Sequence, residues 1–227
     1  MRRYKFIDLK VTDYNSAYDI QREYLDKVKD NRADGYLLAT EHKPVFTLGR
    51  FAKTKNLITP EGELKAKGID VVKTNRGGDI TFHGLGQVVF YPIFNLSYHY
   101  QDVHRYLREL EEVIICSLNT YGIKSHRVKD RTGVWTKQGK IASIGIAISR
   151  WVTYHGFALN ANVDLDYFSM INPCGFKDIK VASMKNILCY EIDMEDLKNE
   201  LIKNFSTVFK AKVETDSLNN LADRYKI

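Results

Sequence analysis

Residues 140–159, with the sequence KIASIGIAISRWVTYHGFAL, contain two strand-like runs on either side of a short polar turn. Both runs, 140–149 and 152–159, are rich in the β-branched and aromatic residues that favour strands. The interruption at Arg150 predicts that they form a β-hairpin. The fold is therefore expected to contain antiparallel strands.

The segments around this hairpin alternate between strand-like and helix-like patterns. Further strands are expected at 36–40, 45–48, 69–73, 87–94 and 133–136. Amphipathic helices are expected at 13–30, 102–121 and 194–210. The buried face of the second is expected to consist of Val103, Leu107, Leu110, Ile114, Leu118 and Tyr121. The strands cluster between the helices without regular β-α-β alternation. The pattern predicts the α+β class, with a mixed or antiparallel sheet flanked by helices, in preference to a doubly wound sheet.

The chain has the size and continuity expected of one domain. It has 227 residues, and no repeat, low-complexity tract or linker divides it, so residues 1–227 are interpreted as a single catalytic domain. No stretch approaches the roughly 20 apolar residues of a membrane span. The N-terminal MRRYKFIDLK lacks the apolar run of a secretory signal. We therefore expect a cytoplasmic protein with no membrane segment.

Charge and metal-ligand patterns exclude two classes of function. The net charge is +6, but the basic residues are scattered and no RNA-binding aromatic signature occurs, so no nucleic-acid partner is expected. A solvated surface and an acidic protein partner both remain open. The three cysteines and six histidines show no metal-ligand spacing, so no metal site is expected.

A glycine-rich segment, RGGDITFHGLGQ, occupies residues 76–87. It is not a Walker A loop, because the lysine and Ser/Thr that end that motif are missing. Glycines let backbone N–H groups approach a ligand closely, and Arg76, Thr81 and His83 supply polar groups between them. The segment is interpreted as the wall of a pocket, with a tightly turned hairpin as the alternative.

Lys140 opens a strand-like run that is otherwise apolar and small. Either its side chain is exposed at the strand end, or it is partly buried and has a chemical role. A desolvated lysine can act as a base or activate a neighbouring thiol. Ser143 is not in a G-x-S-x-G elbow and is not interpreted as a nucleophile.

Cys174 lies between Pro173 and Gly175, a context that favours a turn presenting the side chain. The lysines that follow it favour the thiolate form, which is the nucleophile. Cys116 and Cys189 are instead interpreted as small buried apolar residues. Cys174 is therefore the candidate reactive thiol.

Taken in this order, the three segments resemble the signature of the lipoyl(octanoyl) transferases. RGGDITFHGLGQ resembles their glycine-rich motif, KIASIG their lysine segment, and GFALN followed by NPCG their cysteine segment. Leu85 stands where the family more often has proline. The match covers about residues 35–185 and implies a fold like that of the biotin and lipoate protein ligases.

The resemblance also implies an activity: transfer of an octanoyl group from octanoyl-acyl carrier protein, through a cysteine thioester, to a lysine amine of a lipoyl domain. Such domains occur in 2-oxoacid dehydrogenase subunits and in the glycine cleavage H protein. The carrier's phosphopantetheine holds the acyl group, so neither ATP nor a metal is expected.

By similarity, Cys174 is the nucleophile and Lys140 lowers its pKa. The implied substrate-binding residues are Arg76, Gly77, Gly78, Asp79, Ile80, Thr81, Phe82, His83, Ser143, Ile144, Gly145, Gly156, Phe157 and Ala158.

Two main alternatives remain at the level of sequence. A cysteine hydrolase is a weaker third, because no Asn or Asp can be picked out to orient a histidine. An ATP-dependent lipoate or biotin protein ligase on the same fold would need a nucleotide and no nucleophilic cysteine. A non-catalytic protein that binds an acyl chain or its carrier would show binding without turnover.

Overall fold

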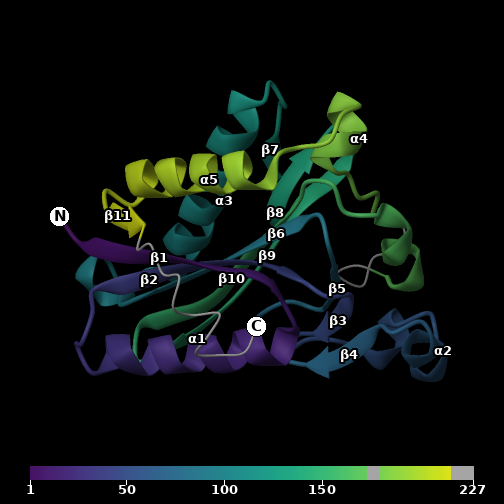
Figure 1. Cartoon of the computed structure of the whole chain (residues 1–227), viewed down its shortest axis with the longest axis horizontal. Helices are drawn as coiled ribbons and strands as arrows, with labels where there is room; N and C mark the ends of the chain where they lie inside the picture. Colours follow the sequence, from purple (N-terminus) through teal and green to yellow (C-terminus); the bar gives the residue numbers. More distant parts are fainter. Residues whose placement is uncertain (173–178, 216–227) are drawn as a thin grey trace.

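The structure is a computed structural model and describes residues 1–172 and 179–215. Within these residues, one sheet has the strand order β11-β1-β2-β6-β10-β9-β8-β7, and a smaller sheet has the order β4-β3-β5 (Figure 1). The strands of the large sheet are β1 (Arg3–Thr12), β2 (Gly35–His42), β6 (Gln87–Phe94), β7 (His126–Val128), β8 (Arg131–Thr136), β9 (Gly139–Ser149), β10 (Val152–Asn160) and β11 (Lys212–Thr215). Those of the small sheet are β3 (Val45–Leu48), β4 (Asp70–Lys73) and β5 (Ile80–His83).

Strand directions in the large sheet are mixed. β1 runs parallel to β2 and to β11, whereas the pairs from β2 to β7 are antiparallel. Helix α1 (Tyr14–Lys29) makes the crossover that a parallel β1–β2 pair requires, and Asp13 caps its N-terminus. The predicted α+β class with a mixed sheet and flanking helices is confirmed.

Helices cover both faces of the large sheet, as Figure 1 shows. α1 packs on one face through an apolar cluster that includes Ile20, Tyr24 and Val28. α3 (Val103–Thr120) and α5 (Met194–Val208) cover the other face and share the largest cluster, to which Leu110 and Phe205 belong. The core is thus two apolar layers with the sheet between them.

The small sheet carries its own apolar cluster, which includes Phe46, Leu64 and Phe82. Two short helices, α2 (Glu61–Ala66) and α4 (Met184–Leu188), and 3-10 turns at Thr54–Asn56, Leu96–Tyr98 and Leu165–Met170 complete the described elements. None of the helices in the described part is long and apolar enough to cross a membrane. The interpretation of residues 1–227 as one catalytic domain stays a prediction.

The central hairpin forms as expected from its turn. Arg150 and Trp151 both adopt left-handed backbone conformations, with φ of 51° and 64°. Two such residues make the turn whose twist matches that of the flanking strands. β9 and β10 therefore pair along eight antiparallel positions, from Val152–Ser149 to Leu159–Ala142.

Three local expectations were wrong. β1, β5, β7 and β11 were not expected as strands, and Val103 is 37% exposed although it was expected on the buried face of its helix. The buried face of α3 is instead centred on Tyr106, Leu110 and Val113. Cys189 is exposed because it follows the end of α4 in a left-handed conformation, outside any packed element.

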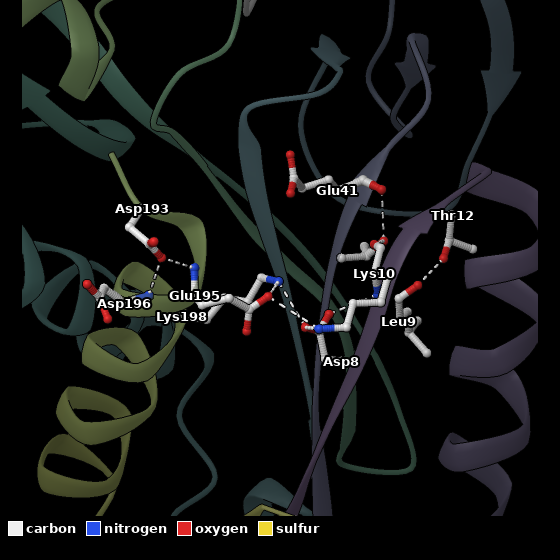
Figure 2. A network of polar contacts seen from close by, with 10 residues as sticks. Asp8, Leu9, Lys10, Thr12, Glu41, Asp193, Glu195, Asp196 and Lys198 are labelled. Carbon is white, nitrogen blue, oxygen red and sulfur yellow. Dashed lines mark hydrogen bonds and ion pairs between the residues drawn. The ribbon is translucent and has the colours of Figure 1, made fainter. Parts of the chain in front are cut away.

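A polar network joins the first and last parts of the described chain (Figure 2). Lys198 of α5 is buried, and its Nζ lies 2.9 Å from both Asp8 Oδ2 of β1 and Glu195 Oε1. Lys10 contacts the same two carboxylates. Lys10 has a φ of 54° and lies where the β1–β2 register shifts between Asp8 and Val11. The network therefore fixes α5 against a bulged part of β1.

Candidate active site

One wall of the candidate site is formed by facing residues of β9 and β10. Ser143 pairs with Ala158, Ile144 with Phe157, and Gly145 with Gly156. The two trios named from sequence, 143–145 and 156–158, are therefore register partners in one antiparallel ladder. The hairpin turn at 150–151 sets this register, since it fixes which residues face each other.

The glycine-rich loop forms the opposite wall and is organised around Arg76. The guanidinium is largely buried and donates hydrogen bonds to the carbonyl oxygens of Thr47 (2.6 Å), Gly77 and Asp79 (both 2.9 Å). Because a buried charge is stable only when its donors are satisfied, these bonds hold the loop in one shape. Arg76 thus holds the loop in place through hydrogen bonds to backbone carbonyl oxygens.

The loop approaches β9 so closely that one strand residue must be glycine. Gly77 N–H donates to Ile146 O at 2.8 Å. A Cβ on Gly145 would lie 2.8 Å from Gly77 O and 3.1 Å from Arg76 Cδ, closer than carbon normally approaches either atom. A side chain at position 145 would therefore separate the loop from the strand.

Lys140 is buried, with 5% of its surface exposed, so of the two positions left open by the sequence the structure has the buried one. Its Nζ lies 5.6 Å from the centre of the Trp135 ring, within the range of a cation–π contact. Lys140 lines two cavities: one formed by β9, β10 and the glycine-rich loop, and a second one bordered by Phe51, Trp135 and Ile144. Its side chain thus lies where two cavities adjoin.

Cys174 lies outside the described residues, but the residues that flank its segment are bonded to the other two motifs. Asn172 N–H donates to Asn56 O at 2.8 Å, and Asn56 Nδ2 donates to Asp79 of the glycine-rich loop. After the segment, Lys180 O accepts from Lys140 N–H at 2.8 Å, and Ala182 N–H donates to Lys140 O at 2.9 Å. Both flanks are therefore attached to the candidate site.

The cavity lined by β9, β10 and the glycine-rich loop brings most of the sequence-predicted residues together. It has an empty volume of about 520 Å³, counting the part open to solvent, and its lining is mostly apolar. The predicted residues that line it are Arg76, Gly78, Asp79, Ile80, Thr81, His83, Lys140, Ser143, Ile144, Gly145, Gly156, Phe157 and Ala158. Gly77 is not among the lining residues. Phe82 is fully buried in the cluster of the small sheet, where its ring stacks on Tyr167.

Four further residues line the cavity and were missed from sequence: Tyr14, Val89, Tyr91 and His155. β6 pairs with β10, with Val89 opposite Ala158, so Val89 belongs to the same wall. Knowledge of the strand order would have identified it. Nothing in the local pattern around Tyr14 or His155 indicated a place in the site.

The histidines beside the cavity are held neutral by burial. His83 Nδ1 lies 2.7 Å from Gln87 Oε1, and burial, followed by the charges of His42 and Arg76, keeps the pKa of His83 well below its usual range. His155 Nε2 lies 2.7 Å from Asn75 Oδ1, and burial lowers the pKa of His155 to about 3. These neutral rings suit an uncharged ligand. Among residues 1–172 and 179–215, no three metal-ligating side chains gather to hold a metal ion.

This geometry defines a class of protein: an α+β fold with a mostly apolar cavity that a buried lysine helps to line. Residues 13–206 match the family described as the lipoyl protein ligase A/B catalytic domain. The match covers most of the chain, and the chain belongs to this family.

A curated relative agrees with this membership, and solved structures share the fold. The chain is 44% identical to an octanoyltransferase of Caldanaerobacter subterraneus subsp. tengcongensis, over 98% of this chain and 97% of the relative. A bipartite lipoate protein ligase from Thermoplasma acidophilum has a similar fold, with a TM-score of 0.73 at 18% identity, over 99% of this chain and 89% of that one. A biotin protein ligase from Aquifex aeolicus has a TM-score of 0.56 at 13% identity, over 91% and 70%. The predicted ligase-like fold is confirmed.

Proposed function

We propose that this chain transfers an octanoyl group from octanoyl-acyl carrier protein to a lysine of a lipoyl domain, through a thioester on Cys174. Octanoyl transfer is the activity named for its relatives at this level of identity. The observation that carries the mechanism is the position of Lys140. Its side chain adjoins the apolar slot, and its backbone is bonded to Lys180 and Ala182, just after the cysteine segment.

In the first step, the Cys174 thiolate attacks the carbonyl carbon of the carrier-bound octanoyl thioester. A new C–S bond forms and the C–S bond to the phosphopantetheine breaks. The carrier thiolate takes a proton from the Lys140 ammonium and leaves as a thiol, so Lys140 becomes an amine. Lys140, as an ammonium, favours the attacking thiolate. The slot between β9, β10 and the glycine-rich loop holds the alkyl tail away from water.

In the second step, the amine of the acceptor lysine attacks the Cys174 thioester. An amide bond forms and the bond to the Cys174 sulfur breaks, which regenerates the thiolate. Lys140, as an amine, accepts the proton that the attacking nitrogen releases. The cavity beyond Trp135 offers an approach to Lys140 from outside the acyl slot, first for the carrier arm and then for the acceptor.

The proposed donor is already a thioester, so the reaction as written uses no nucleotide and no metal. The acceptors we propose are the lipoyl domains of 2-oxoacid dehydrogenase subunits or the glycine cleavage H protein. Both transfers would take place in the cytoplasm, where carrier and acceptor meet.

Intact mass spectrometry after incubation with octanoyl-acyl carrier protein tests the mechanism. We expect the wild type to gain the mass of one octanoyl group and Cys174→Ser to gain none. Cys116→Ser is the matched control, because Cys116 lies in α3 outside both cavities, and it should form the adduct normally.

An adduct that persists in Cys174→Ser would contradict the proposed nucleophile. Modification of a lipoyl domain with free octanoate and ATP, but not with the octanoyl carrier, would instead establish the ligase alternative.

A further inference from the structure

β9 contains a bulge next to Lys140. Val134 of β8 pairs with Ala142, but its neighbour Trp135 pairs with Lys140, so Ile141 is an extra residue on β9. A bulge turns the side chains beside it away from the ordinary alternation of a strand. The direction of Lys140 therefore depends on how β8 and β9 meet at this point.

Gly133 of β8 lies directly against the Lys140 side chain. A Cβ at position 133 would lie 2.7 Å from Lys140 Cε, 3.3 Å from Lys140 Nζ and 2.6 Å from Ala142 O. Gly133 also has a φ of 128°, which side chains other than glycine rarely allow. The absence of a side chain at 133 thus leaves the space that the end of Lys140 occupies.

Glu111 of α3 is hydrogen-bonded to the backbone of Gly133. Its side chain is fully buried, and Oε1 accepts a hydrogen bond from Gly133 N–H at 3.0 Å. Oε2 lies 2.9 Å from Arg108 Nη1 and 3.1 Å from Arg127 Nε, which balance its charge. A bond from a carboxylate to a backbone N–H is stronger than one from a neutral group. Glu111 therefore joins α3 and β7 to Gly133, the glycine against which the Lys140 side chain lies.

We infer that Gly133 is a positioning residue for Lys140 and that Glu111 holds Gly133 in place. The inference rests on the proposed role of Lys140 and extends it to two residues that line neither cavity. Gly133 has no side chain and so leaves space for that of Lys140. Glu111 holds Gly133 by accepting a hydrogen bond from its backbone N–H.

The rate of Cys174 alkylation by iodoacetamide, followed against pH in the full-length protein, tests this inference. Gly133→Ala should displace the Lys140 amine and slow alkylation near neutral pH about tenfold, the effect of raising a thiol pKa by about one unit. Glu111→Gln keeps an acceptor for Gly133 N–H but loses the charge, so it should slow alkylation in the same direction by a smaller factor. Glu111→Gln also decides the question if Gly133→Ala does not fold, as judged by circular dichroism.

Gly122→Ala is the matched control for backbone strain. Gly122 also has a left-handed backbone, with a φ of 73°, but no atom lies within 4 Å of the Cβ it would gain. Its alkylation curve should match that of the wild type. In a Lys140→Ala background, Gly133→Ala should cause no further slowing, since the residue through which it acts is gone.

The outcomes separate this inference from the proposed function. A wild-type curve in folded Gly133→Ala or Glu111→Gln, alongside a slowed Lys140→Ala, would overturn the positioning inference alone. An unchanged curve in Lys140→Ala would overturn the proposed role of Lys140. Slowing by Gly133→Ala that persists in full without Lys140 would show that Gly133 acts by another route.

Discussion

Three buried histidines, His42, His83 and His155, lie within or behind the cavity wall. His42 illustrates how they are held: Nδ1 lies 2.9 Å from Thr12 O, and Nε2 lies 2.6 Å from Tyr91 Oη. Burial lowers the pKa of His42 to about 4. Each ring is therefore neutral in the folded protein at neutral pH, whereas the unfolded chain protonates its histidines near pH 6.5.

This difference predicts a loss of stability in mild acid. Below about pH 6.5 the unfolded state takes up protons that the folded state does not, so stability falls as the pH drops toward the folded pKa. For His42 alone, the free energy of unfolding should fall by about 2 kcal/mol between about pH 7.5 and pH 5. Urea unfolding at the two pH values measures this loss.

The matched variants are His42→Asn and His104→Asn, the second at an exposed position of α3. His42→Asn should be less stable at neutral pH but lose less on acidification, because the group that titrates is absent. His104→Asn should behave as the wild type. Equal losses in the wild type and His42→Asn would show that the pKa of His42 does not differ between the folded and the unfolded state.

Much of the candidate site could be predicted from single residues, for identifiable reasons. Lys140 was recognisable because a charge opened an apolar strand. Residues 143–145 and 156–158 were implied by the family resemblance, and the register of the hairpin explains why they lie together. Glu111 and Tyr91 could not be found in the same way. The partners of Glu111 are Gly133 and two arginines, one of them 16 residues away, so only the assembled fold shows why that carboxylate is buried.

At the scale of elements, the contact between β1 and α5 depends on charge as well as on apolar packing. Burial alone would raise the pKa of Asp8, but hydrogen bonds from Lys198 and Lys10 outweigh it and lower that pKa below its usual range. Removing one partner of a buried ion pair leaves the other charge uncompensated. The network in Figure 2 is therefore expected to stabilise the attachment of α5.

Asp8→Asn should lower the free energy of unfolding by about 2 kcal/mol, because Lys198 would keep only Glu195 as a charged partner. Lys203→Ala is the control on the same helix, since its contact with Glu200 is exposed at the lysine and should contribute less than about 0.5 kcal/mol. Chemical denaturation measures both. A loss in Asp8→Asn no larger than that of the control would show that the network does not stabilise α5.

The same region explains why β1 was missed as a strand. Its buried positions, Tyr4, Ile7, Leu9 and Thr12, do not alternate regularly, because the register shifts between Asp8 and Val11. Strand prediction relies on a period of two, and a bulge interrupts that period. β6 and β10 have no such shift with their neighbours and were predicted close to their observed bounds.

At the scale of the whole molecule, the net charge of +6 has two interpretations left open by the sequence, a solvated surface and an acidic protein partner. The dependence of activity on salt distinguishes them. If the positive charge attracts an acidic carrier protein, salt should weaken binding of the carrier, because screening shortens the range of attraction between exposed charges. Raising sodium chloride from about 0.05 M to about 0.5 M should then raise KM for the octanoyl carrier protein about threefold or more.

Octanoyl-pantetheine is the matched control substrate, since it presents the same thioester without the charged carrier. Its KM should change little over the same range of salt. Equal effects on the two substrates would assign the positive charge to solubility alone.

The position of β1 between β2 and β11 also has a consequence for how the protein is made. Arg3 is the register partner of Lys212, and Asp8 forms an ion pair with Lys198. The first strand therefore contacts residues that come near the end of the described chain. During synthesis, the N-terminal strand leaves the ribosome roughly 200 residues before β11, at about 5–20 residues per second. For this interval of tens of seconds one edge of β1 has no neighbouring strand, and such an edge is open to pairing with other chains. The newborn chain should therefore depend most on chaperones before α5 and β11 emerge.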